Sequence, residues 1–266
     1  MAVELRPLSP ALGVELVGVD PCAEPEPGVR ALAREALLEH GLVLVRGHEL
    51  SLDEQLSFAA WFGPVNTRGY SFGADVEMYI SNSHDKGVAR QGSLLLHQDH
   101  CFLDQPLPAI CLYAQEVTRT GGATIFADAR KAHDRLPDGL RRRLGTLEAL
   151  HLYDYANDYG NERFRVATAS PEAPRAAHSV VIEHPETGRP ILYVNRLMTD
   201  SLVGLDGDES EALLDELMTY FEGDAVRYVH TWRLHDLVVW DNLALQHGRT
   251  DFPPDERRCL RRIQIG

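Results

Sequence analysis

One stretch joins an apolar strand pattern to metal-binding residue types: Leu94-Leu95-Leu96-His97-Gln98-Asp99-His100. Successive strand residues point to opposite faces, so we expect His97 and Asp99 to project from one face and Gln98 from the other. An imidazole and a carboxylate at this spacing supply two thirds of the 2-His-1-carboxylate triad, which binds Fe(II) and leaves three coordination positions open. In a chain with 12 histidines, roughly one His-x-Asp arises by chance, so other residues must decide its meaning.

The composition is that of an ordinary globular protein, with 266 residues, 44% of them hydrophobic and 25% charged. We expect a single domain over residues 1–266. The formal net charge of −14 argues against nucleic acid or an anionic membrane as a partner, because phosphate binding needs clustered basic surface. No apolar run approaches the roughly 20 residues that span a bilayer.

The four cysteines show neither a Cys-x-x-Cys pair nor the spacing of a disulfide framework. We interpret Cys22, Cys101, Cys111 and Cys259 as reduced, mostly buried thiols. The first residues also lack the charged-then-apolar pattern of a signal peptide. Both observations favour a cytoplasmic protein.

Hydrophobic periodicity predicts a chain that is mainly β with flanking helices. Helices are expected over residues 29–38, 51–61 and 208–221, the second opened by a Ser51-x-x-Glu54 capping box. A hairpin is expected around Thr187-Gly188. Strands are predicted at 14–19, 42–45, 78–81, 93–97, 109–116, 124–127, 180–183, 191–194, 226–232, 237–240 and 259–264. Many short strands, with helices gathered early, favour one double-sheet barrel.

A polar excursion over residues 155–178 interrupts the strand pattern. Loops of this length in compact domains are usually functional lids or disordered. We interpret this one as a substrate-covering loop. Arg163 and Arg165 within it are candidates for contact with an anion.

A second informative stretch is Trp240-Asp241-Asn242-Leu243-Ala244-Leu245-Gln246-His247-Gly248, where an apolar strand ends in a turn and a histidine precedes glycine. His247 is a plausible third metal ligand after the chain returns around a barrel. Arg258 and Arg262 share a strand face because their separation is even. Arginine suits a carboxylate, since its planar fork matches both oxygens.

Together these residues resemble the taurine dioxygenase and phenoxyacetate-herbicide dioxygenase family of Fe(II)/2-oxoglutarate-dependent oxygenases. The resemblance runs nearly end to end, from L-G-V-E-L-V-G-V-D to R-R-C-L-R-R-I. Its most specific pieces are H-Q-D, T-G-G-A-T and W-D-N-L-A-L-Q-H-G, with an arginine eleven residues beyond that last histidine.

The resemblance implies a double-stranded β-helix, that is, a jelly-roll or cupin-like core. It implies that His97, Asp99 and His247 bind iron. Thr124 and Arg258 would hold the distal carboxylate of 2-oxoglutarate. The implied reaction couples oxidative decarboxylation of 2-oxoglutarate to succinate and CO2 with oxidation of a substrate C–H bond by O2. Because Asp99 is present, where halogenating relatives lack this carboxylate, hydroxylation is favoured.

Substrate recognition is less determined. Arg262 matches the arginine that contacts an acidic group of the substrate in relatives, so we expect a small acidic substrate. Other candidate substrate residues are Tyr70, Ser71, Ser93 and His100. Ser93 replaces an amide found in the taurine enzymes, and Leu96 replaces a frequent aromatic residue, so taurine itself is disfavoured.

Several alternatives stay open at this stage. The same iron chemistry could give desaturation, epoxidation or cyclisation of a biosynthetic intermediate. More remote alternatives are a zinc hydrolase that activates water with the same three ligands and a silent barrel that only binds. Whether copies of the chain associate is also open.

Overall fold

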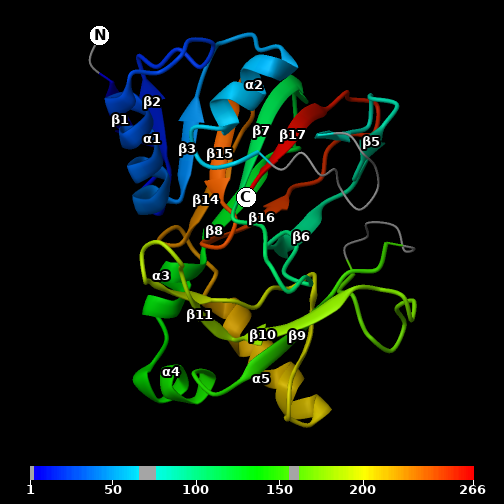
Figure 1. Ribbon diagram of the computed structural model, residues 1–266. Helices are drawn as coiled ribbons and strands as arrows, with labels where there is room; N and C mark the ends of the chain where they lie inside the picture. The colour runs from blue at the N-terminus through cyan, green and yellow to red at the C-terminus, as the bar shows by residue number, and fades with distance from the viewer. Residues whose placement is uncertain (1–2, 66–75, 156–161) are drawn as a thin grey trace.

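The computed structural model describes residues 3–65, 76–155 and 162–266, and its body is a jelly roll of two β-sheets (Figure 1). The larger sheet has eight strands in the order β1-β2-β3-β15-β7-β17-β4-β5. The smaller has four, in the order β14-β8-β16-β6. The bounds of the larger sheet are, in that order, Glu4–Pro7, Val14–Val17, Leu42–Val45, Leu237–Asp241, Ala109–Glu116, Cys259–Ile265, Glu77–Ser81 and Gly87–Val88. Those of the smaller are Arg227–His230, Thr124–Asp128, Leu245–Arg249 and Leu94–His97.

Strands β3 and β15 of the larger sheet are buried on both faces, which explains their apolar runs LVLV and LVVW. In β15, Val238 and Trp240 face the barrel interior and pack with Phe126 of the smaller sheet. Leu237 and Val239 alternate with them and enter a separate core on the outer face. The two-residue period thus divides one strand between two cores.

Helices α1 (Pro27–His40) and α2 (Leu52–Ala59) cover this outer face. The predicted capping box at the start of α2 is confirmed, with the Ser51 hydroxyl and the Glu54 side chain each accepting the other's backbone N–H. Helix α1 ends at Gly41, whose φ of 75° is the left-handed conformation that glycine tolerates. The ends of both helices lie within about two residues of the predicted ends.

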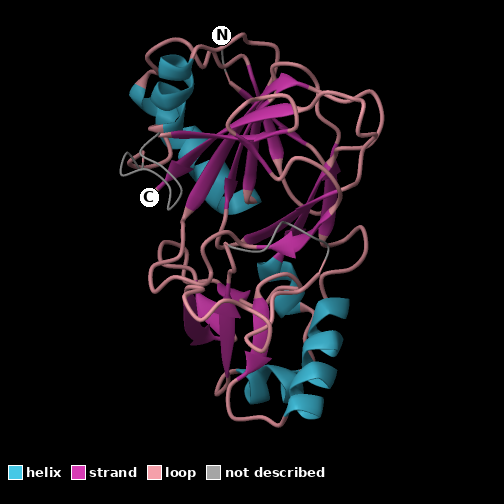
Figure 2. Cartoon of the chain, turned by 90° about the vertical axis from the view of Figure 1, so that its right-hand side faces the viewer, coloured by secondary structure: helices cyan, strands magenta, loops and turns pink. Residues whose placement is uncertain are grey.

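A smaller lobe lies below the barrel and has its own hydrophobic core (Figure 2). It contains helix α5 (Gly207–Thr219), which was predicted, and helices α3 (Ala129–Asp134) and α4 (Asp138–Leu144), which were not. The expectation that helices gather early in the chain was therefore wrong. These two helices are too short for a periodic signal, although Asp128 caps α3 by accepting from Arg130 N–H and Lys131 N–H.

Two small sheets complete this lobe. One has the order β10-β9-β13, with bounds Arg175–Ser179, Glu148–Leu152 and Thr199–Leu202, and the other pairs β11 (Val181–Glu183) with β12 (Pro190–Leu192). The β11–β12 pair confirms the hairpin expected around Thr187-Gly188. The excursion predicted over 155–178 is shorter than expected, because its last residues form β10 and pair with β9.

All four cysteines are free, and Cys101, Cys111 and Cys259 are buried whereas Cys22 is exposed. This agrees with the expectation of reduced, mostly buried thiols. Burial raises the pKa of the Cys101 and Cys111 thiols to about 12. Among the described residues, no helix is long and apolar enough to cross a membrane.

The buried His151 of β9 makes stability sensitive to acid. Burial and the neighbouring His178 lower its pKa from 6.5 to about 3. Below pH 6.5 the unfolded chain therefore binds a proton that the folded chain excludes, and stability falls as the pH falls. From pH 6.5 to about pH 5 we expect a loss of about 2 kcal/mol from this one group. Urea unfolding at both pH values measures this loss. His151→Gln should lose less unfolding free energy between pH 6.5 and about pH 5 than the wild type does, and an equal loss in the two proteins would contradict the role of His151.

Candidate metal centre and pocket

Two histidines meet across neighbouring strands of the smaller sheet. His97 ends β6, His247 lies in β16, and the two are direct partners in the strand register. Their ring centroids are 4.3 Å apart. His97 Nδ1 lies 2.8 Å from the Leu95 carbonyl, which fixes this nitrogen as the N–H donor and leaves the lone pair of Nε2 facing the site.

Asp99 lies one residue beyond the strand, because β6 ends at His97. The strand ends where it was predicted to end, so Asp99 does not share a strand face with His97 as the two-residue spacing implied. Gln98 is buried away from the site, as predicted, and donates to the Leu243 carbonyl at 3.1 Å. Asn242 holds the Asp99 main chain, accepting from its N–H at 3.0 Å and donating to its carbonyl at 2.9 Å. A side-chain amide replaces the strand pairing that would otherwise place Asp99.

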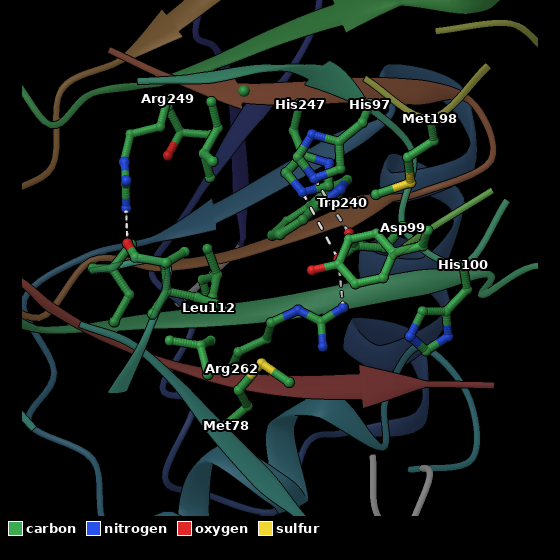
Figure 3. A pocket seen from close by; sticks show the side chains of 18 of the residues that line it. Met78, His97, Asp99, His100, Leu112, Met198, Trp240, His247, Arg249 and Arg262 are labelled. Atoms are coloured by element: carbon green, nitrogen blue, oxygen red, sulfur yellow. Dashed lines mark hydrogen bonds and ion pairs between the residues drawn. The ribbon is translucent and has the colours of Figure 1, made fainter. Parts of the chain in front are cut away.

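The side chains of His97, Asp99 and His247 converge on one point (Figure 3). Their ligand atoms all lie within 4.8 Å of one another. Asp99 Oδ1 lies 3.3 Å from His97 Nε2, and Asp99 Oδ2 lies 3.9 Å from His247 Nε2. Two imidazole nitrogens and one carboxylate form the donor set of a non-haem Fe(II) centre.

The environment keeps His247 and Asp99 free of protons. Burial and the nearby His97 lower the pKa of His247 to about 3, so its imidazole is neutral. Burial raises the pKa of Asp99, but the positive charge of Arg262 outweighs burial and holds that pKa well below its usual value. Metal ligands must be deprotonated to bind, and these groups meet that requirement at neutral pH.

Arg258 and Thr124 line one end of the pocket, and each has a hydrogen-bonding group that is not used there. Arg258 Nε donates to the Gly122 carbonyl at 3.1 Å, whereas its Nη1 is buried without a hydrogen-bond partner among the described residues. Thr124 Oγ1 accepts from Trp232 Nε1 at 2.9 Å, which leaves the hydroxyl hydrogen available. Burial and the charge of Arg249 lower the pKa of Arg258 to about 9. A carboxylate fits this end and would satisfy the buried guanidinium.

Arg249, which the sequence analysis missed, also lines this end. It lies two residues after His247 in β16, and this even spacing was the signal that could have found it. All three of its guanidinium nitrogens donate to backbone carbonyls, those of Ala89, Gln91 and Gly92. Arg249 therefore holds the 89–92 segment against the pocket.

The opposite side of the triad carries Arg262 and His100 (Figure 3). Arg262 Nη2 donates to Asp99 Oδ2 at 2.6 Å. His100 has a left-handed φ of 61°, and its Nε2 lies 3.2 Å from Gln264 Nε2. Arg262 and His100 both line the pocket, as expected of substrate candidates.

The remaining wall is largely apolar and comes from elements far apart in the sequence. Phe102 stacks on Tyr153, with centroids 5.1 Å apart, and Tyr153 meets Tyr155 at 4.7 Å. Sequence reasoning missed most of this wall, since nothing local marks its members. They include Met78, Ile80, Val88, Leu94, Phe102, Leu112, Tyr153, Tyr155, Met198, Trp240 and Leu260.

Other predicted substrate residues lie elsewhere. Ser93 does not line the pocket, although its neighbour Leu94 does. Arg163 and Arg165 do not line it either, because both form ion pairs with Glu211 of α5. These arginines connect the loop to α5, and the structure does not bring them to the pocket. Tyr70 and Ser71 lie outside the described residues.

Comparison with known proteins identifies the family. The protein-family model described as "Taurine catabolism dioxygenase TauD, TfdA family" matches residues 4–264. The chain belongs to this family.

Its relatives include pentalenolactone F synthase of Streptomyces avermitilis, 32% identical over 86% of this chain and 82% of that protein. Another is (S)-phenoxypropionate/alpha-ketoglutarate-dioxygenase of Delftia acidovorans, 30% identical over 92% of this chain and 88% of that protein. A crystal structure of AAD-2 with Mn(II) and N-oxalylglycine superimposes with a TM-score of 0.84 at 25% identity, covering 100% of this chain and 97% of that one.

The protein is therefore an Fe(II)/2-oxoglutarate-dependent dioxygenase that uses O2 and acts on a small organic molecule. The jelly-roll core inferred from the resemblance is confirmed. The zinc hydrolase and the silent barrel no longer compete, because the named relatives are 2-oxoglutarate-dependent dioxygenases.

Proposed function

We propose that His97, Asp99 and His247 bind the Fe(II) of this dioxygenase and that Thr124 and Arg258 bind the distal carboxylate of 2-oxoglutarate. The observation that carries the second assignment is the buried, unpartnered Nη1 of Arg258. Leaving a buried charged donor unsatisfied is costly, so a carboxylate at this position is strongly favoured. When bound, iron and 2-oxoglutarate supply the oxidising chemistry, and the protein supplies ligand geometry, the carboxylate clamp and a shaped pocket.

Arg258→Gln is expected to raise the KM for 2-oxoglutarate about 100-fold, because a charge-assisted, forked contact with a carboxylate is lost. Succinate formation at varied 2-oxoglutarate concentration measures the effect. Arg257→Gln is the matched control, since Arg257 is exposed and pairs with Glu116 outside the pocket. A KM unchanged by Arg258→Gln would contradict the clamp.

We propose further that the organic substrate carries an anionic group. The charged residues among the described pocket lining are three arginines and one aspartate, a net charge of +2 with neutral histidines. The charges of Fe(II) and the 2-oxoglutarate dianion cancel, so this positive charge remains. We assign the anionic group to Arg262, because Arg249 already donates to three backbone carbonyls and Arg258 is assigned to 2-oxoglutarate.

A matched pair of ligands tests the anionic substrate without altering the protein. Phenoxyacetate and 2-phenoxyethanol share an aromatic ether body and differ in the carboxylate. We expect the acid to bind at least about tenfold more tightly to the anaerobic Fe(II)·2-oxoglutarate protein, since hydrogen bonds to charged groups contribute about 1.5–3 kcal/mol. Calorimetric titration measures both ligands. Equal affinity, or a preference for the alcohol, would show that the pocket does not select an anion.

Hydroxylation is the outcome we propose for the substrate C–H bond, with Asp99 occupying the carboxylate position. Desaturation, epoxidation and cyclisation use the same metal ligands. The relative named pentalenolactone F synthase supports a biosynthetic intermediate as the alternative substrate. We also propose that the chain is one domain and that the segment around Tyr155, which lines the pocket, helps to cover the substrate. The free cysteines support a cytoplasmic location.

A further inference from the structure

Arg262 makes the shortest contact to a proposed iron ligand. Its Nη2 donates to Asp99 Oδ2 at 2.6 Å, the length of a strong charge-assisted hydrogen bond. The Arg262 side chain is only 5% exposed, and its backbone is paired on both sides, with Met78 of β4 and Leu112 of β7. The guanidinium therefore reaches Asp99 from the interior of the larger sheet, on a strand held by two neighbours.

The other contacts around Asp99 act on the main chain or on the next residue. Asn242 holds the N–H and the carbonyl of Asp99. Gln264, two residues after Arg262 on the same face of β17, meets the His100 ring. Among the described residues, Arg262 is the one side chain besides the two histidines that contacts the Asp99 carboxylate itself. Main-chain contacts place the turn, but they leave rotation of the carboxylate free.

We propose that Arg262 is a positioning residue that fixes the Asp99 carboxylate for metal binding, in addition to meeting the anionic group of the substrate. This inference rests on the proposed iron site. With Oδ2 held by Arg262, the lone pairs of Oδ1 remain beside His97 Nε2. The contact thus favours binding through a single oxygen. That matters chemically, because a carboxylate bound through both oxygens would occupy a position that this triad keeps open.

The role is distinguishable from substrate binding because it operates when no substrate is present. A residue that only meets the substrate leaves metal affinity unchanged in the substrate-free protein. A residue that orients a ligand alters it, and changes in such supporting contacts typically weaken metal binding about 10- to 100-fold.

The experiment is a titration of the protein with Mn(II), without 2-oxoglutarate or substrate, in which electron paramagnetic resonance reports free Mn(II). We expect Arg262→Gln to weaken Mn(II) binding about 10- to 100-fold. Arg262→Lys keeps the charge but loses the planar fork, so we expect it to weaken binding as well, to a smaller extent.

The matched control is Arg258→Gln, which removes another buried arginine of the same pocket, from its opposite end, without touching Asp99. Both Gln variants delete one positive charge near the metal, which by itself favours metal binding. Arg258→Gln should therefore bind Mn(II) as well as the wild type or better. Wild-type affinity in both Arg262 variants would overturn the inference.

Each failure has a distinct signature. If circular dichroism shows that Arg262→Gln does not fold, the Mn(II) affinity of Arg262→Lys relative to the wild type tests the inference instead. If the wild type and His247→Ala bind Mn(II) alike, the proposed iron site itself fails. If Mn(II) binding behaves as expected but phenoxyacetate shows no advantage over 2-phenoxyethanol, the anionic substrate fails and the positioning role stands.

Discussion

Replacing Asp99 with asparagine is expected to lower succinate formation by about three orders of magnitude in the presence of Fe(II), 2-oxoglutarate and O2. The amide is a weak, neutral ligand, and its N–H2 group would face either the metal or the guanidinium of Arg262. At 2.6 Å from Arg262 Nη2, an amide nitrogen would be repelled, so the side chain must turn. The substitution therefore removes a ligand charge and also disturbs the orientation of the remaining oxygen.

Asp104→Asn is the matched control for this prediction. Asp104 is exposed, lies five residues further along the same connection, and does not line the pocket. Its activity should equal that of the wild type. Retention of activity within about tenfold by Asp99→Asn would remove Asp99 from the proposed triad. Succinate formation supported by Zn(II) in place of Fe(II) would contradict the redox chemistry itself.

The proposed metal ligands could be predicted from sequence because short motifs mark them. His97 and Asp99 needed only a two-residue spacing, and His247 needed a strand that returns beside the first. His97 and Asp99 do reach one point, as predicted, but not because they share a strand face. Asp99 lies past the strand end and is placed by the Asn242 side chain. A long-range amide contact leaves no periodic trace in sequence.

The pocket wall could not be predicted in the same way. Tyr153 and Met198 come from the lower lobe, whose packing decides which of its side chains reach the proposed iron site. Arg163 and Arg165 show the converse, since their charges suggested a ligand and are used instead on Glu211. Charge in a loop does not reveal its partner. Tertiary structure determines which polar side chains remain available.

Gly248 is the position where a small change is expected to disturb both the fold and the metal site. Between the register partners His247–His97 and Arg249–Leu94, β16 has one intervening residue and β6 has two, so Gly248 opposes a bulge. A Cβ added at Gly248 would lie 2.7 Å from the Leu94 carbonyl oxygen and 3.3 Å from the Leu95 carbonyl carbon. These are backbone atoms of the strand that carries His97, and they cannot rotate away as a side chain could.

Gly248→Ala is therefore expected to push β6 away from β16 and to shift the Leu95 carbonyl that orients the His97 ring. We expect a loss of about 1–3 kcal/mol in the free energy of unfolding, the usual range for overpacking. Because β6 is an edge strand, much of the strain should be relieved by its movement, and Mn(II) affinity should fall at least about tenfold.

Gly139→Ala in α4 provides the control, since a Cβ there meets nothing within 4 Å. In a helix this change should be neutral or stabilise by up to about 1 kcal/mol, with Mn(II) affinity unchanged. Urea unfolding of the metal-free proteins and Mn(II) titration together separate the effects. If Gly248→Ala lost stability but bound Mn(II) like the wild type, β6 would have kept His97 in place and the bulge would serve only strand packing. If both quantities fell together, the close approach of β6 and β16 at Gly248 would be what holds the two histidines at metal-binding distance.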